Sequence, residues 1–538
     1  MTAHPSRPTL GLLFDALEHE HPRELWRGWL DFASENDCHA LGFLGGYLPS
    51  MCAVEGLEAP DPRNFIHRLP GRENVQGLAI RLGALSREGG EAEDLCAKFP
   101  GLPLVSVGFA VPGVPTVTED AAQGIFAAVG HLVKAHGFRR LAYLRGPDGN
   151  PFAEARFEAF ARAVEGHGLA VDPRLVTPGD DWSHAAGARA MGFLLDDRRV
   201  TFDAVLAAND RLALGAIEVL KAHGLKVPGD VGVIGFDNLD ESRFCFPSLT
   251  TIQYPSYQLG RRAAEVLLGQ IRGQSAPPAT GVAASLVIRQ SCGCLPESVA
   301  RAGHGRASPV SLESAKAAWV SAVGAPAWAG GLWDSLVREL DQGTPEFLLH
   351  WSETLNRSGA ETEDLATWEN VLSQLRQFHP LGDRNRADRA ENLWHQARVL
   401  TAQRASDREE ARRSADREAS RRFLGSVARL SAPSGAEAAR TVIEEGMSLS
   451  IGHWWVVACD DPGQGLARVL GRQRDLFPSR QLIPQGLDEA ERWALVVEPL
   501  AVGNRVAGYL VIDADAPLRW PMAALLAPIA RMVAEDSP

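Results

Sequence analysis

Long apolar runs are missing from this chain. No stretch reaches the ~18 to 20 residues that a membrane-spanning helix needs, and no hydrophobic segment follows the start methionine as it would in a secretion signal. Cysteine is also scarce, with seven in 538 residues, an odd number without regular spacing. Such a set fits reduced thiols better than a disulfide framework. We therefore expect a cytoplasmic protein that makes no use of a membrane.

Positive charge is in short supply as well. The chain has 54 Lys+Arg against 67 Asp+Glu, a formal charge of −13. A protein that reads DNA needs a basic face to neutralise phosphates. The charge balance therefore argues against direct DNA binding.

Catalytic signatures are absent too. The sequence has no GGDEF-like cyclase motif, no GxxxxGK[ST] phosphate loop, no histidine-kinase phosphoacceptor box, no HExxH and no GxSxG. An enzyme that used Asp120 or Asp237 as a base would lack a matched acid or nucleophile. We expect no enzymatic activity, no catalytic residue, no metal site and no cofactor.

The most informative segment runs from Phe202 to Gly260, where strand, polar turn, helix and strand follow one another closely. An apolar run ends at Asn209–Asp210, a largely apolar helix follows, and a second buried strand ends at Asp237. This order is typical of a parallel α/β sheet. Ligands of such sheets bind at the carboxyl ends of the strands, so these polar tips are candidate ligand contacts.

The same pattern recurs earlier in the chain, which predicts an α/β fold with parallel sheets flanked by helices. Helical segments fall between most of the strands, for example Gly124 to His136 and Ala153 to Gly166. The further predicted strands lie at Leu10 to Leu17, His39 to Leu48, Val75 to Gly83, Leu102 to Phe109 and Arg139 to Pro147.

Several motifs in a fixed order resemble the effector-binding core of the lactose-repressor family. They are HLVKAHGFRRLAYLRGP, the arginine-bearing EARFEAFARAV, DWSHAAGARA, AANDRLALGA, VPGDVGVIGFDN and PSLTTIQYP. The resemblance covers residues 10–295, after a leader of residues 1–9. It implies a two-lobed periplasmic-binding-protein-like fold with a ligand between the lobes.

The resemblance also implies a set of ligand-binding residues. Arg156 would reach polar groups of the ligand, and Trp182 would stack on a sugar or base. Asn209 and Asp237 would hydrogen-bond hydroxyls, as a neutral polyol or nucleoside requires. The remaining candidates are the acidic Asp120 in TVTEDAAQG, Gln253 on a hinge strand, and Asp15, which lies in a first-lobe stretch that departs from the family pattern.

Each of these residues also has a plain structural interpretation. Arg156 could pair with Glu154 or Glu158 on a solvated helix. Trp182 could simply pack in the core or on the surface, and Asp237 could be a turn or helix cap.

Both ends of the core differ from a family repressor. Repressors of this family carry a helix-turn-helix ahead of the core, whereas here the first strand begins near Leu10 after MTAHPSRPT. We therefore expect no DNA-binding headpiece. The closing sequence LVIRQSCGC is similar to the junction in a subset of the family that is fused to C-terminal signalling domains such as diguanylate cyclases.

Beyond this junction the length allows further domains. A linker at 296–311 precedes amphipathic segments at 312–400, which predict a small helical bundle. Residues 401–422 alternate in charge and predict a helix that is either solvated or a signalling helix paired in a dimer. Residues 423–534 resemble a small α+β GAF-type domain, with a strand at Trp454 to Cys459, a hairpin turning at Gly503–Asn504 and a closing helix from Met522 to Val533.

Together these features predict a cytoplasmic, homodimeric sensor for a small polar effector, such as a carbohydrate or nucleoside. Closure of the lobes would be relayed through the bundle and the charged helix to the GAF-like domain, and a signalling protein would be a further partner. The alternative is a core that has lost its ligand. It would then act as a dimer scaffold for a separately encoded kinase, cyclase or transcription factor.

Overall fold

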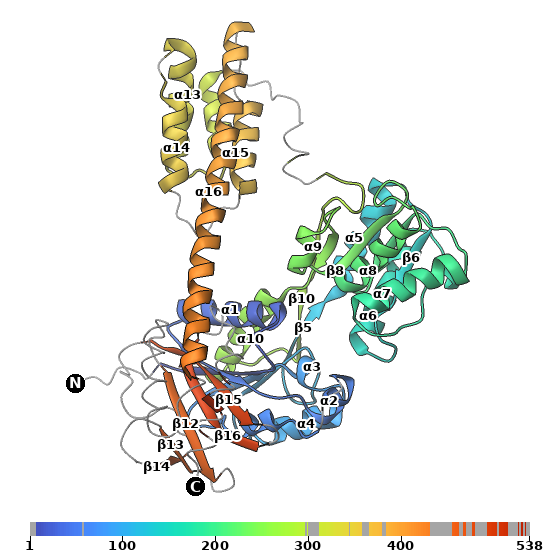
Figure 1. The fold of residues 1–538 in the computed structure, drawn as a ribbon, viewed down its shortest axis with the longest axis vertical. Helices are drawn as coiled ribbons and strands as arrows, with labels where there is room; N and C mark the ends of the chain where they lie inside the picture. Colours follow the sequence, from blue (N-terminus) through green and yellow to red (C-terminus); the bar gives the residue numbers. More distant parts are fainter. Residues whose placement is uncertain are drawn as a thin grey trace, which may run out of the picture. The chain divides into compact units, whose positions relative to one another are not determined.

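The computed structural model describes residues 7–295 except 56 and 58, residues 299, 311–343, 345–357, 365–378, 384–430, 454–461, 466–469, 476–478, 492–502 and 505–514, and four residues near the end, 526, 529, 530 and 533. They form two compact units (Figure 1). One comprises Met1–Val287 with Arg421–Pro538, and the other is Ile288–Ser420.

The first lobe contains a parallel sheet with the strand order β10-β5-β4-β3-β1-β2. The strands β1 to β4 are almost wholly apolar and buried, as strands covered on both faces must be, whereas β5 and the edge strand β10 are partly exposed. The strands are β1 (Thr9–Phe14), β2 (His39–Leu44), β3 (Gly77–Ile80), β4 (Leu104–Val107), β5 (Thr116–Asp120) and β10 (Ala279–Ala283).

Helices cover both faces of this sheet (Figure 1). One apolar core lies under α1 (Glu20–Glu35) and α10 (Ser256–Ile271), and it contains Trp26 and Trp29. The core on the other face includes residues of η1 (Pro62–Arg68), α3 (Leu82–Leu85) and α4 (Gly89–Ala97), and α2 (Pro49–Glu55) also belongs to this lobe.

The second lobe has a five-stranded sheet with the order β11-β9-β8-β7-β6. All pairs are parallel except β11 with β9. Its strands are β6 (Leu141–Leu144), β7 (Ala204–Ala207), β8 (Gly232–Asp237), β9 (Thr250–Gln253) and β11 (Ser285–Val287). Its helices are α5 (Ala121–Ala135), α6 (Pro151–Gly166), η2 (Pro173–Leu175), α7 (His184–Gly192), η3 (Phe193–Asp197), α8 (Asp210–Ala222) and α9 (Asp240–Phe244).

The chain passes between the lobes at three places. It leaves the first lobe from β5 into α5, returns from β9 into α10, and crosses again between β10 and β11. The predicted two-lobed α/β fold is thus confirmed. Three strands of the two lobes were not predicted: β5, which residues 116–120 form, β10 and β11.

The C-terminal strands continue the sheet of the first lobe. β15 (Ala494–Val502) pairs in parallel with β2, in the register Ala494 with Ala40 to Val497 with Phe43. Next come β16 (Arg505–Asp513), β12 (Trp454–Asp461), β13 (Leu466–Val469) and β14 (Leu476–Pro478), all paired antiparallel. Both apolar cores of the first lobe extend over these strands, through Val496 on one face and Val497 on the other.

The predicted hairpin is confirmed, because β15 and β16 pair antiparallel up to Val502 and Arg505. Its turn, residues 503 and 504, lies outside the described residues, as does most of the predicted closing helix at 522–533. These strands lie in the same compact unit as the first lobe. The assignment of 423–534 to a GAF-like domain stays a prediction.

The unit Ile288–Ser420 is helical. It holds α12 (Leu312–Ala322), α13 (Ala329–Gln342), α14 (Phe347–Arg357), α15 (Leu365–Phe378) and most of α16 (Arg384–Leu430). Five tryptophans, at 319, 333, 351, 368 and 394, are buried in its core. The predicted charged helix is part of α16, whereas nearly all of the linker 296–311 lies outside the described residues. Within the described part of the chain, no helix combines the length and the apolarity needed to cross a membrane.

Candidate functional site

A cavity of about 580 Å³ lies between the two lobes. Its walls come largely from segments that follow the carboxyl ends of β1, β3, β7 and β8, where α/β sheets bind ligands. Five of the seven predicted residues line it, namely Asp15, Arg156, Trp182, Asn209 and Asp237.

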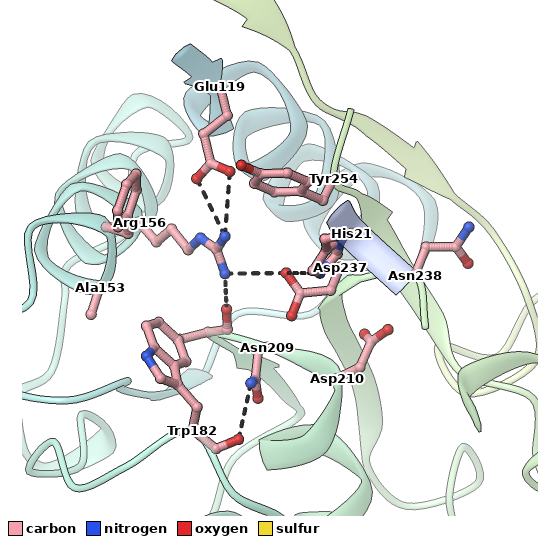
Figure 2. Close-up of polar contacts among 12 residues, drawn as sticks. His21, Glu119, Ala153, Arg156, Trp182, Asn209, Asp210, Asp237, Asn238 and Tyr254 are labelled. Carbon is pink, nitrogen blue, oxygen red and sulfur yellow. Dashed lines mark hydrogen bonds and ion pairs between the residues drawn. The ribbon is translucent and has the colours of Figure 1, made fainter. Parts of the chain in front are cut away.

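Arg156 lies at the centre of the site (Figure 2). It projects from α6, which begins where the Asn150 side chain accepts hydrogen bonds from the backbone N–H groups of Phe152 and Ala153. Its guanidinium group donates to the backbone oxygen of Ala208 at 2.8 Å. The same group lies 3.3 Å from a carboxylate oxygen of Glu119 and 3.5 Å from Asp237 Oδ1.

Aromatic rings complete the surroundings of Arg156. Its guanidinium carbon lies 3.7 Å from the centre of the Phe236 ring and 5.6 Å from that of the Trp182 ring. Such contacts favour a desolvated cation. The alternative of a solvated helix arginine is therefore wrong: Arg156 is buried, and Glu154 contacts Arg145 instead.

Asp237 ends β8 in an unusual conformation. Its backbone φ is +113°, a region that L-residues rarely adopt and that occurs preferentially at functional sites. Burial raises the pKa of its carboxyl group to about 8. At neutral pH this side chain therefore holds a proton for most of the time, and it can donate a hydrogen bond as well as accept one.

His21 approaches Asp237 from the first lobe. Its Nε2 lies 3.8 Å from Asp237 Oδ1, its Nδ1 lies 3.2 Å from the hydroxyl of Ser256, and its ring is 4.7 Å from that of Tyr254. Burial lowers the pKa of His21 to about 3, with the nearby charge of Arg81 acting in the same direction. The imidazole is therefore neutral at pH 7.

Asn209 and Trp182 are linked (Figure 2). The Asn209 amide donates to the backbone oxygen of Trp182 at 3.0 Å, and its Oδ1 accepts from Leu212 N at 2.8 Å to cap α8. Asn209 therefore fixes the segment that carries the Trp182 ring.

Asp210 is wholly buried and ties together the segments around β8. Its carboxylate accepts from Leu239 N at 2.9 Å and from the hydroxyl groups of Ser242 and Thr251. In the first lobe, Asp15 forms an ion pair with Arg81, and both line the cavity.

Two predicted residues do not line this cavity. Asp120 is exposed and caps α5 by accepting from Ala122 N at 3.1 Å, while its neighbour Glu119 lines the cavity and contacts Arg156. The side chain of Gln253 bonds to Asn238 and to the backbone oxygen of Tyr254, and Tyr254 is the residue at the cavity wall. In both cases the side chain at the wall belongs to an adjacent residue.

Two first-lobe residues at the cavity, His21 and Arg81, were not predicted from the sequence. His21 stands in the first turn of α1 and Arg81 directly follows β3. The predicted strand, Val75 to Gly83, included Arg81 near its carboxyl end, where ligands of α/β sheets bind, and this is a signal that could have identified it. His21 had no comparable signal.

Residues 129–292 match the family of periplasmic binding protein-like domains. Over 184 residues the chain is 39% identical to the HTH-type transcriptional repressor CytR of Escherichia coli K12, covering 34% of this chain and 53% of that protein. Over 262 residues it is 28% identical to the HTH-type transcriptional repressor PurR of Haemophilus influenzae, covering 48% and 74%.

Among solved structures, the Escherichia coli transcriptional repressor ascG is similar to this chain at 25% identity, with a TM-score of 0.42 over 53% of this chain and 98% of that one. The chain spans about half the length of the CytR repressor, 53%. Both of these relatives are named as repressors of transcription. Residues 129–292 of this chain are therefore similar to a periplasmic binding protein-like domain, and part of the chain is similar in sequence to the repressor CytR.

Proposed function

We propose that the cavity between the lobes binds a small polar metabolite, a sugar or nucleoside-like molecule, and that this binding is a regulatory signal. The observation that carries the proposal is the central cluster of Arg156, Trp182 and Asp237, to which the first lobe adds His21 and Glu119. A ligand with a hydroxylated ring needs an aromatic side chain to stack on. It also needs nearby groups that donate hydrogen bonds and groups that accept them.

Ligand binding would act on the relative position of the lobes. In the first lobe, Glu119 lies on β5 and His21 lies on α1. Glu119 contacts Arg156 of the second lobe, and His21 contacts Asp237. A ligand inserted among these groups changes contacts that hold the lobes together. It shifts the arrangement only if it binds one arrangement more tightly than the other.

The regulatory part of the proposal is supported by the relatives, which are named as transcriptional repressors and regulators. We propose that this chain acts as a homodimer without binding DNA itself, in keeping with its charge of −13. Its output would pass to a separate signalling protein.

We further propose that the signal reaches the C-terminal segment through the sheet of the first lobe. The pairing of β15 with β2 and the shared apolar cores support this route. The sequence had suggested a relay through the bundle and the charged helix. The direct pairing adds a shorter path from the cavity to the GAF-like segment.

A thermal-melt screen of the full chain against sugars, polyols, nucleosides and purines tests the proposal. A ligand at about a hundred times its dissociation constant stabilises the folded state by ~2.7 kcal/mol. We expect at least one compound to raise the melting temperature of the wild type and to lose this effect in Trp182→Ala. The variant Trp328→Ala, in the helical unit, serves as the matched control.

The scaffold alternative predicts a different result. A well-folded chain whose melting temperature no compound changes would contradict a live ligand site. A partner protein would then be sought with the full chain as bait.

A further inference from the structure

We propose that the cavity accepts uncharged ligands and rejects their phosphorylated or carboxylated counterparts. This inference rests on the proposed function and narrows the ligand class of the same site. The charge of the ligand distinguishes a nucleoside from a nucleotide and a sugar from a sugar phosphate.

The wall of the cavity is dominated by acidic groups. Seven carboxyl side chains line it, of which Asp237 is mostly protonated at neutral pH, against four guanidinium groups. Three of the carboxyl groups, Glu18, Asp240 and Glu241, are on exposed residues, so they lie on the solvent-facing part of the cavity wall. Like charges that line a cleft repel an approaching anion and lower its rate of association.

The two inner arginines are already neutralised by the protein. Arg81 pairs with Asp15, and Arg156 contacts both Glu119 and Asp237 while it donates to the Ala208 backbone. A phosphate that displaced Glu119 from Arg156 would leave this buried carboxylate unpaired. Such a loss is expensive in a desolvated site.

The remaining guanidinium groups lie further out on the wall. Arg211 is exposed at the start of α8, and Arg87 is half-buried after α3. A phosphate held at Arg211 is the strongest competing arrangement, because an exposed guanidinium can contact an anion without desolvation. The variant Arg211→Ala therefore belongs in the test.

What the cavity does offer suits an uncharged ring. Carboxylate oxygens accept hydrogen bonds from hydroxyl or amino groups, and the protonated Asp237 can donate one. The rings of Trp182, Phe152 and Tyr254 also line the cavity and provide faces for stacking or apolar contact. A hydroxylated ring with no net charge can use all of these groups without displacing an ion pair.

Isothermal titration calorimetry with matched pairs tests the inference. The four common ribonucleosides are compared with their 5′-monophosphates, and common hexoses with their 6-phosphates, on the full-length protein. For any ring that binds, we expect the phosphorylated form to bind at least tenfold more weakly. The double variant Asp240→Asn with Glu241→Gln should reduce this ratio, whereas the control Glu218→Gln, on the outer side of α8, should leave it unchanged.

The possible results separate the two proposals. Equal or tighter binding of a phosphorylated form overturns the charge selectivity while it supports a ligand site. Loss of that binding in Arg211→Ala would then identify the anion contact. Failure of every uncharged and every phosphorylated compound to bind contradicts the proposed function itself, and the selectivity with it.

Discussion

Nε2 of His21 lies 3.8 Å from Oδ1 of Asp237, so a residue in the first turn of α1 meets the residue that ends β8 across the cavity. Burial lowers the pKa of His21 to about 3 and raises the pKa of Asp237 to about 8. Both side chains are therefore mostly uncharged at neutral pH. The contact between the lobes is a neutral one at this point.

The raised pKa of Asp237 makes folding stability depend on pH. The folded protein keeps a proton on this carboxyl group where the unfolded chain has lost it, so its stabilising contribution is full below about pH 4 and is lost as the pH rises through about 8. We expect Asp237→Asn to flatten the fall in unfolding free energy between about pH 6.5 and 8.5 by up to ~1.4 kcal/mol per pH unit. Urea unfolding of the wild type and the variant at several pH values in this range measures the change in unfolding free energy.

The range from about pH 6.5 to 8.5 avoids the titration of His21. The lowered pKa of His21 makes the unfolding free energy rise with pH, opposite to the effect of Asp237. The contribution of His21 is lost as the pH falls from about 6.5 towards 3. The exposed Asp197 supplies the control Asp197→Asn. Parallel pH profiles for wild type and Asp237→Asn would contradict the assignment.

Removal of Arg156 should destabilise the fold. Arg156→Ala leaves the Glu119 carboxylate without its ion pair and opens space beside Phe236 and Trp182. We expect a loss of about 3–5 kcal/mol in unfolding free energy, measured in denaturant. Arg162→Ala, at an exposed position of the same helix, should change stability by less than about 0.5 kcal/mol. Equal effects of the two substitutions would show that the Arg156 cluster carries no stability.

Close packing of α1 against α10 depends on two glycines. A Cβ on Gly28 would overlap the backbone oxygen of Tyr257, and one on Gly260 would overlap that of Leu25. We expect Gly260→Ala to cost about 1–3 kcal/mol through forced separation of the helices. Gly90→Ala in α4 meets nothing within 4 Å and should be neutral or stabilising. Melting temperatures that do not separate the two variants would contradict the helix contact.

The pairing of β15 with β2 makes a prediction about the C-terminal segment. Val496 is wholly buried in the core that contains Trp26, whereas Val502 at the end of the strand is partly exposed. Val496→Ala should increase hydrogen exchange in both β15 and β2, because the two strands share backbone hydrogen bonds. Val502→Ala should affect neither strand. Faster exchange confined to β15 would show that the C-terminal strands open independently of the lobe.

Buried strands and the helices between them could be predicted from apolar runs and turn residues, since burial on both faces leaves a plain signal in sequence. The lateral pairing of β15 with β2 could not. Both strands are apolar runs about 450 residues apart, and no local pattern specifies which edge a strand joins.

The errors at the site have a physical cause as well. Successive side chains of a strand point to opposite faces, so a shift of one residue exchanges the cavity face for the other. Glu119 rather than Asp120 therefore contacts Arg156, and Tyr254 rather than Gln253 lines the cavity. Motif order places a residue along the chain, but it does not specify which of two neighbouring side chains points into the cavity.

The most direct test of a ligand site between the lobes is calorimetric titration of a compound that stabilises the wild type in the melt screen. Wild type, Trp182→Ala, Asp237→Ala and the control Asp197→Asn are compared under the same conditions. We predict that each of the two cavity substitutions weakens binding at least tenfold, ~1.4 kcal/mol, while the control does not. Unchanged affinity in both cavity variants would contradict the site.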